Sequence, residues 1–355
     1  MLESIKKNPY EMICDYTESI YPHTGKEVFE VLSLVPCSLI LPDISYFSKT
    51  IRTNMNVLFL TLSGGAKSSL CKQFATFSYF PIEARSYTPA GLEKEIEAKP
   101  VFSLIIEDYA TMAQDERILK IIEGIIGEEK VLDRHTTKKN VRKSVEGIGL
   151  FCGVPADLSS KLTSGTIFRT ICLVVMHTDE EHSEIGLHIN RNIGDTNNHK
   201  QLESDIRDYY TLLQEIQAGK HKEHPPVLGY DIQQMFKDAL YKEWNVLTRV
   251  YRKNAPFNFF RELHDGYRML VSLAFLNYFN RTIKDGMLVV EHEDCKIAVS
   301  LMRQTLQTKY ELLMSEKLGK SVKNINQLQK IMKSNKIPQR VKALMPMHLK
   351  GQLNK

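Results

Sequence analysis

The sequence predicts an α/β domain with a central parallel sheet, followed by a helical domain. Up to about residue 195, short continuous apolar runs alternate with helix-like stretches, and such runs are typical of strands buried in a parallel sheet. Beyond that point the short apolar runs stop and helical periodicity continues. The length of 355 residues allows one large domain or two modest ones, and an apolar fraction of 43% provides for a sizeable core.

Four strands are expected in the α/β part. Their apolar runs occupy residues 56–62, 101–106, 148–152 and 171–176. Helix-like stretches between them occupy residues 69–79, 92–98 and 115–126. Parallel strands need crossover connections, which are usually helices, so the alternation predicts one sheet with helices on its faces. Residues 1–50, ahead of the first strand, read as helices.

The helical part follows a polar loop at residues 192–200. Helices are expected at residues 202–218, 230–251, 259–280 and 292–316, with a breaker-rich link, KHKEHPP, after the first of them. We therefore expect four segments along the chain. These are a helical lead-in over residues 1–50, an α/β core over 51–195, a helical domain over 196–315 and a basic tail over 316–355.

Composition favours a protein that stays in the compartment where it is made. No apolar run approaches the roughly 20 residues that a membrane-spanning helix needs. The start, MLESIKKNPYE, has no apolar stretch after its lysines, unlike a secretory signal. The six cysteines form no CxxC pair and are expected to be buried, reduced thiols. We expect a cytoplasmic protein, nuclear if the source is a eukaryote, with no membrane partner.

The charge of the last segment is one-sided. The net charge of the chain is only +5, yet no acidic residue follows Glu316. The cations beyond it are Lys317, Lys320, Lys323, Lys330, Lys333, Lys336, Arg340, Lys342, Lys350 and Lys355. Such a tail suits a polyanion, and solvated disorder explains it equally well.

A phosphate-binding loop is predicted where the first apolar run ends. The segment Thr-Leu-Ser-Gly-Gly-Ala-Lys-Ser-Ser, residues 61–69, follows a strand and opens a helix. Small residues let backbone N–H groups approach phosphates, a lysine neutralises charge and a serine hydroxyl can hold Mg²⁺. The residues that would contact the ligand are Gly64, Gly65, Ala66, Lys67, Ser68 and Ser69. Thr61 and Ala66 occupy glycine positions of the general pattern, so an ordinary glycine turn before a helix is the alternative.

An acidic pair stands after the second apolar run. Glu107 and Asp108 directly follow VFSLII, and carboxylates at the end of a strand neighbouring the phosphate loop could reach the metal and the attacking water. Acidic residues that cap a helix after a strand are also common. The two signals together, in this order and on these elements, indicate a nucleotide site more strongly than either alone.

These residues resemble the AAA+ motor domain of the minichromosome maintenance (MCM) replicative helicases. The landmarks run in order. They are residues 19–34 before the core, 52–74 with the phosphate loop, 86–96 toward the helix-2 insert, 105–112 as Walker B, 167–189 with the arginine-finger strand, and 260–268 in the lid. The family also has Ala-Lys-Ser in its phosphate loop, so Ala66 fits it. The likeness covers roughly residues 18–305, and implies an α/β P-loop AAA+ domain followed by a helical lid.

The resemblance implies an ATPase that works as a ring, expected to be a hexamer, with ATP and Mg²⁺. Glu107 falls at the metal-binding position together with Ser68, and Asp108 at the water-activating one, which reverses the family's order. Arg169 matches the finger that a neighbouring subunit contributes, and Arg261 matches the sensor-2 arginine. Ordinary surface or pairing arginines are the alternatives. The sensor-1 position, Asn in the family, is Val154.

A hairpin with a basic tip is expected between the acidic pair and the third apolar run. Val131, Leu132, Val141 and Val145 flank a Thr-Lys-Lys-Asn centre. In the family a hairpin at this place enters the ring pore and touches DNA phosphates without choosing a sequence. The candidate DNA contacts are Lys138, Lys139, Arg142 and Lys143. A solvated run of charges explains them equally well.

Three hypotheses follow from these observations. The first is an MCM-like helicase of DNA replication that translocates on, unwinds or remodels DNA. Fifty residues before the core leave no room for the family's N-terminal DNA-binding collar, so this would be a stripped motor, such as a virus or mobile element would encode. Val154 and the reversed acidic pair weaken the hydrolytic machinery, which favours an initiator or assembly switch with little turnover. A protein-remodelling AAA+ chaperone is the third hypothesis.

Overall fold

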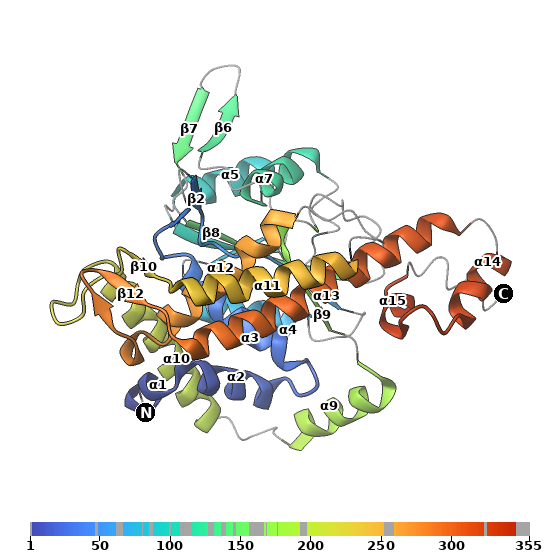
Figure 1. The fold of residues 1–355 in the computed structure, drawn as a ribbon, viewed down its shortest axis with the longest axis horizontal. Helices are drawn as coiled ribbons and strands as arrows, with labels where there is room; N and C mark the ends of the chain where they lie inside the picture. The colour runs from blue at the N-terminus through green and yellow to red at the C-terminus, as the bar shows by residue number, and fades with distance from the viewer. Residues whose placement is uncertain are drawn as a thin grey trace.

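The computed structural model describes most of the chain. The described residues are 2–46, 49–61, 67–79, 81–84, 88–98, 101–106, 109, 115–126, 131–135, 140–144, 147–155, 167, 169–175, 177–191, 197–251, 259–322 and 325–345. A five-stranded parallel sheet lies at the centre, covered on both faces by helices, and the helical second half packs directly against it (Figure 1).

The central sheet has the strand order β4-β5-β8-β3-β9. Its strands are β3 (Val57–Thr61), β4 (Pro81–Ala84), β5 (Val101–Ile106), β8 (Gly147–Pro155) and β9 (Ile171–Val175). Every pairing between them is parallel. All five carboxyl ends therefore meet at one edge of the sheet, which is where α/β folds bind ligands.

Two findings differ from the expectations. The fifth strand, β4, has no apolar run because it is an edge strand in which Pro81 and Glu83 are exposed and Ile82 is buried. The acidic pair was expected on a strand next to the phosphate loop, but β8 lies between β3 and β5. The strand before the acidic pair is therefore one position further from the phosphate-loop strand than expected.

Side chains of β3 alternate between two buried layers. Val57 and Phe59 belong to a core shared with the N-terminal helices and the helices after residue 196, and Leu58 and Leu60 to a core on the opposite face. The first layer is built with α2 (Pro9–Ile20), α3 (Lys26–Ser38), α4 (Lys67–Phe77), α10 (Asn197–Gln217) and α12 (Phe259–Leu276). The second is built with α5 (Pro89–Ala98), α7 (Glu116–Ile126) and part of α13 (His292–Ser321). Burial on both faces explains why β3 reads as a continuous apolar run.

The region after residue 196 was expected to be helical throughout, but it also contains three strands. Between α10 and α13, beside α11 (Gln234–Tyr251) and α12, three short strands form a second sheet of order β10-β12-β11. They are β10 (Gly229–Asp231), β11 (Ile283–Lys284) and β12 (Met287–Val289). Asp285 and Gly286, both with positive φ, connect β11 to β12. Asp-Gly is a strong two-residue hairpin signal. In the lead-in, β1 (Ile44–Tyr46) and β2 (Lys49–Ile51) also replace expected helix.

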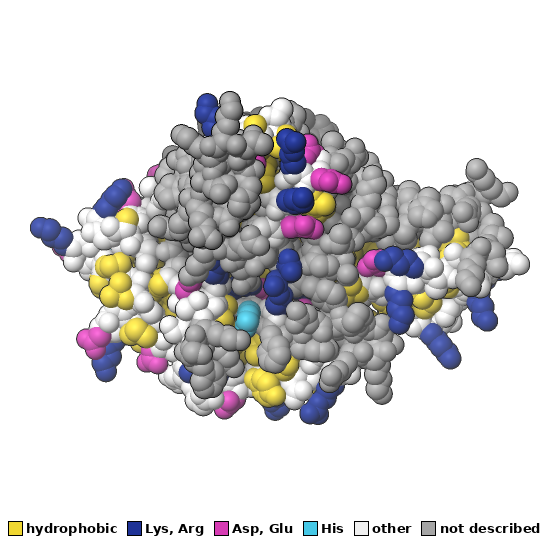
Figure 2. Space-filling view, turned by 90° about the horizontal axis from the view of Figure 1, so that it is seen from above, with side chains coloured by type: hydrophobic (Ala, Val, Ile, Leu, Met, Phe, Trp, Pro, Cys, Tyr) yellow, Lys and Arg dark blue, Asp and Glu magenta, His cyan; other side chains and the backbone are white. Residues whose placement is uncertain are grey.

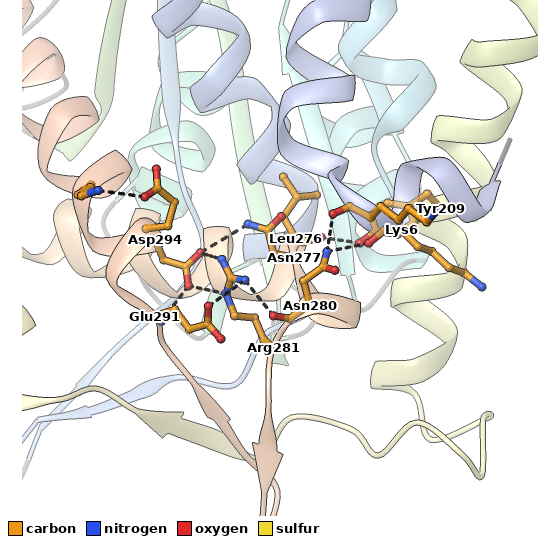
Figure 3. A network of polar contacts seen from close by, with 11 residues as sticks. Lys6, Tyr209, Leu276, Asn277, Asn280, Arg281, Glu291 and Asp294 are labelled. Carbon is orange, nitrogen blue, oxygen red and sulfur yellow. Dashed lines mark hydrogen bonds and ion pairs between the residues drawn. The ribbon is translucent and has the colours of Figure 1, made fainter.

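A polar network fixes the start of α13 against the N-terminus (Figure 3). The Arg281 guanidinium donates to both carboxylate oxygens of the buried Asp294, at 2.8 and 2.6 Å. Glu291 and Asp294 also form a capping box at the helix start. One residue before Arg281, the Asn280 amide donates to the carbonyl oxygens of Lys6 and Lys7 in and at the end of α1 (Leu2–Lys7). The network therefore joins segments from the two ends of the chain.

The last segment is folded as far as residue 345. Helix α13 crosses the boundary expected at residue 316 and ends at Ser321; α14 (Ile325–Lys333) and α15 (Gln339–Ala343) follow. Val341, Leu344 and Met345 are buried, so solvated disorder is wrong for the described part of this segment. Five cysteines in the described part of the chain are buried and unbridged, as expected. None of the described helices is long and apolar enough to cross a membrane.

Candidate nucleotide site

The carboxyl edge of the sheet carries the predicted phosphate loop. Strand β3 ends at Thr61, which is buried, and α4 begins at Lys67. The connection, with Gly64, Gly65 and Ala66, lies outside the described residues, as does the side chain of Lys67. The predicted strand–loop–helix context of a phosphate loop is thus present around it.

The N-terminus of α4 is arranged to receive an anion. Leu70, Cys71 and Phe74 hold the helix in the core, while Ser68 and Ser69 in its first turn are exposed. The first turn has no acidic residue, so no carboxylate in that turn neutralises the partial positive charge of the helix N-terminus. The Tyr21 hydroxyl donates to the Ser69 carbonyl at 3.3 Å. These residues fit a phosphate group, and Ser68 is exposed where a metal-binding hydroxyl is needed.

Strand register shows how the acidic pair and sensor position lie relative to this helix. Leu60 of β3 pairs with Val154 of β8, and Cys152 of β8 pairs with Ile106 at the end of β5. With neighbouring strands about 4.8 Å apart, β3 and β5 are separated by roughly 10 Å. Glu107 and Asp108, which follow β5, lie outside the described residues. Tyr109, immediately after them, is buried in the core and holds this connection to the sheet.

Arg169 lies away from this edge. It is exposed, two residues before β9, and the Ile171 N–H donates to the Asn56 carbonyl at 2.7 Å, just before β3 begins. Arg169 therefore stands at the amino end of an outer strand. The four steps from Val57 to Thr61 add about 13 Å of strand between that end and the phosphate loop. The chain does not bring Arg169 and its own phosphate loop together.

Arg261 lies in the first turn of α12, partly buried, beside Glu262. Glu262 belongs to a buried charge cluster with Asp265, Arg268 and Lys309. The Lys309 ammonium lies 3.3 Å from Asp265 and 3.8 Å from Glu262, and its charge also acts on Cys172 in the amino half of β9. The start of α12 is thus packed toward the same end of β9 that carries Arg169.

Burial determines the protonation chemistry of this cluster. Burial raises the pKa of Glu262 to about 7, although the attraction of Lys309 acts against the rise. Burial alone would lower the pKa of Lys309, but Asp265 and Glu262 keep that pKa above its ordinary value. The Arg268 guanidinium donates to Asp265 at 2.7 Å and to the Arg52 carbonyl at 2.7 Å. The cluster therefore ties α12 and α13 to the segment that leads into β3.

Sequence reasoning did not single out this cluster. The sequence does contain one signal for it, a lysine on the apolar side of a helix. Lys309 lies at helical spacing from the buried residues of α13, which are Thr305, Leu306, Leu312 and Leu313. A lysine is almost never fully buried without a partner. Lys309 therefore called for acidic partners on a facing helix, which α12 supplies.

The expected basic hairpin is present. Strands β6 (Val131–His135) and β7 (Asn140–Ser144) pair antiparallel, with Arg142 opposite Asp133 and Lys143 opposite Leu132. The hairpin extends away from the body beyond α5 and α7 (Figure 1). Its tip, with Lys138 and Lys139, and the side chains of its strands lie outside the described residues. The DNA contacts assigned to it stay predictions.

Comparison of the sequence with protein-family models gave no match, and comparison with curated proteins gave none either.

Proposed function

We propose that this chain is an MCM-like AAA+ ATPase that couples ATP hydrolysis to translocation on DNA, and so to unwinding or remodelling in DNA replication. The observation that carries the proposal is the arrangement of three adjacent strands. The phosphate loop follows β3, the sensor position Val154 lies on β8, and the acidic pair follows β5. On this proposal, the residues that act on one nucleotide come from neighbouring strand ends at a single edge of the sheet.

The division of roles follows from chemistry at that edge. Backbone N–H groups of Gly64, Gly65 and Ala66 and the first turn of α4 cradle the phosphates, and Lys67 neutralises their charge. Ser68 and Glu107 would hold a Mg²⁺, and the metal would supply neutralisation of the charge that develops on the phosphates. Asp108 orients and deprotonates the attacking water. Ser69 completes the first turn that faces the phosphates.

A ring is supported by the position of Arg169. This arginine and the start of α12, with Arg261, lie toward the amino end of β9 and not at the carboxyl edge. If they stabilise charge on ATP, the ATP belongs to another subunit. A head-to-tail interface generates a ring when its rotation closes, and on this proposal the ring is a hexamer. An arginine supplied in this way is worth about 10³–10⁵ in rate.

DNA is the proposed track because a hairpin with a basic tip extends from the motor core (Figure 1). Lys138 and Lys139 at the tip, with Arg142 and Lys143 on β7, would contact phosphates in the pore of the ring. Such contacts give affinity without sequence preference.

A nucleotide-regulated switch is the second candidate function. It is favoured by Val154, which has no amide to orient water, and by the order Glu107–Asp108, which gives the shorter carboxylate the task of reaching the water. On this alternative the chain binds ATP, assembles and turns over slowly or not at all.

Mixed-subunit ATPase assays test the motor. Lys67→Ala and Arg169→Ala should each abolish turnover, one by losing the nucleotide grip and the other by losing the finger. When the two variants are mixed in equal amounts and allowed to exchange subunits, about a quarter of interfaces combine an intact loop with an intact finger, and activity should return to that extent.

The outcomes separate the hypotheses. Failure of the mixture to recover any activity would contradict the shared site. Tight ATP binding by the wild type with no hydrolysis, with or without DNA, would leave the switch. Absence of DNA affinity at low salt would favour a chaperone that acts on protein. Lys138→Ala with Lys139→Ala should weaken the salt dependence of DNA binding; an unchanged dependence would remove the pore hairpin.

A further inference from the structure

The C-terminal unit, residues 317–345, is a small folded body built on the end of α13. Leu328 of α14 and Met345 are buried together, and Leu318, Val322, Ile331 and Met332 pack around them. The protein itself therefore covers Leu328 fully and Ile331 and Met332 in part. Its other side faces solvent, as the exposure of Gln327, Gln329 and Lys330 shows.

The C-terminal unit is held in a fixed place on the motor core. The Arg340 guanidinium donates to the carbonyl of Val174 in β9 at 3.2 Å and pairs with Glu311 of α13 at 3.2 Å. Leu344 is buried in the core layer that covers the central sheet. Any ligand bound by the unit is thus coupled to β9, the strand that follows Arg169.

The exposed side of the unit is basic. Lys330 and Lys333 lie three residues apart on one side of α14, and Lys336 follows in the turn after it. All three are exposed, and none forms an ion pair with a carboxylate among the residues that the structure describes. Lysine and arginine side chains stand out at the right-hand end of the molecule, the end that carries α14 and α15 (Figure 2).

We propose that Lys330, Lys333 and Lys336 form a nucleic-acid contact surface that binds the phosphodiester backbone without sequence preference. Charge complementarity is the first argument, because no carboxylate follows Glu316 to neutralise these lysines locally. Residue type is the second: lysine ammonium groups act as point charges on phosphates and do not read bases in the bidentate manner of arginine.

A membrane surface is the competing polyanion, and the packing of α14 argues against it. An interfacial helix binds lipid by burying its apolar face among the acyl chains while its basic face meets the headgroups. In α14 Leu328 is buried, and Ile331 and Met332 are partly buried, against the end of α13 and Met345. The charged face is the more exposed one, which suits a phosphate backbone.

This surface goes beyond the proposed motor function. It lies far from the β6–β7 hairpin in Figure 1, and it needs neither ATP nor a ring pore. It would keep the protein bound to nucleic acid during the steps in which the β6–β7 hairpin releases it. Its test therefore omits nucleotide.

The test replaces the three lysines in the full chain, as K330Q/K333Q/K336Q, and measures the affinity for a duplex DNA by fluorescence anisotropy over a range of salt concentrations. A plot of log K against log salt should lose about 2.7 from its slope, because each phosphate contact contributes about 0.9. The matched control is K237Q/K242Q/K284Q, which removes the same charge from three exposed lysines on α11 and β11, outside the C-terminal unit. The control should lose less than one unit of slope.

Each remaining outcome is decisive. An unchanged slope in K330Q/K333Q/K336Q, an equal loss in the control, or no DNA binding by the wild type at low salt would overturn the surface. So would binding to phosphatidylserine vesicles that the triple variant loses while its DNA slope stays the same. The variant should keep the wild-type ATPase rate in the absence of DNA. Because the DNA-binding measurement uses no nucleotide, it tests the surface even if the motor hypothesis fails.

Discussion

The two ends of helix α13 treat charged side chains in opposite ways. At its start and middle, Asp294 and Lys309 are buried and paired with Arg281, Asp265 and Glu262. Beyond its end, Lys330, Lys333 and Lys336 of the C-terminal unit are exposed, and no carboxylate follows Glu316 in the sequence.

The difference shows which charges are available for function. A buried ion pair has already lost its water, so both partners are committed to each other and removal of one leaves an uncompensated charge. An exposed lysine costs the fold almost nothing and keeps its hydrogen-bond donors for a ligand. Changes at the buried end should therefore alter stability and leave ligand binding intact, and changes at the exposed end should do the reverse.

The largest expected effect is at Asp294. Asp294→Ala removes the carboxylate that accepts two hydrogen bonds from Arg281 and the side chain that caps α13. Because Arg281 is then left with the half-exposed Glu291, at 3.4 Å, in place of a buried carboxylate, the free energy of unfolding should fall by about 3 kcal/mol. Urea denaturation followed by circular dichroism measures it.

The neighbouring acid provides the control. Glu293→Ala removes an exposed carboxylate that pairs with Lys296 in the same helical turn and should cost less than about 1 kcal/mol. The double variant Arg281→Ala with Asp294→Ala should be more stable than Asp294→Ala alone, since no charge is then stranded. A loss at Asp294 no larger than at Glu293 would contradict the buried network.

A second effect depends on pH and comes from Glu262. Its pKa is about 7 in the folded chain and 4.5 for an ordinary glutamate, so the folded state binds a proton more tightly between these values. Stability must therefore fall as pH rises from about 4.5 to 7, and the cost above pH 7 is roughly 3 kcal/mol at 1.36 kcal/mol per unit. Glu262→Gln stays neutral, so its stability should change less between pH 5 and 8 than that of the wild type.

Thermal unfolding at closely spaced pH values measures this slope. Glu316→Gln, which removes an acid paired with the exposed Lys320, should leave the slope unchanged. Parallel curves for the wild type and Glu262→Gln would mean that Glu262 is ionised across this range and that Lys309 fully compensates its burial.

Sequence patterns predicted the centre of the fold better than its edges. Strands β3 and β9 have all five residues buried, so their composition alone distinguishes them. Strand β4 has one covered side and a mixed composition, and the β10-β12-β11 sheet consists of strands of two or three residues, which are too short to show a period. The exception is Asp285–Gly286, a turn signal that was present and not used.

In the candidate site, too, some features follow from local sequence and others depend on tertiary structure. Local patterns suffice to predict the strand and the helix on either side of the candidate phosphate loop, and the β6–β7 hairpin, because each is formed by consecutive residues. The insertion of β8 between β3 and β5, and the distance of Arg169 from its own phosphate loop, depend on strand order, which no local pattern contains. Partners of Lys309 come from a helix more than 40 residues away in the chain, so the cluster is a product of tertiary packing.

The smallest expected effect is at Arg340. Its side chain is about one-third exposed (34%), so it is intermediate between the buried ion pairs and the exposed lysines. Arg340→Gln removes the ion pair with Glu311 and the hydrogen bond to the Val174 carbonyl, a loss of about 1–2 kcal/mol. Leu344 and Val341 still anchor the unit, so the loss should be local. Amide hydrogen exchange should quicken in residues 325–345 and stay unchanged in β3.

Lys336→Gln is the matched control, since it removes one exposed cation from the same unit without a core contact, and its exchange should equal that of the wild type. Equal quickening in β3 and in the C-terminal unit would mean that Arg340 supports the whole fold. Arg340→Gln leaves Lys330, Lys333 and Lys336 in place. If it also lowers the slope of log K against log salt for DNA binding, then the position of these lysines, and not their number alone, determines the affinity for DNA. In that case a side chain facing the core would act on the ligand through the exposed ones.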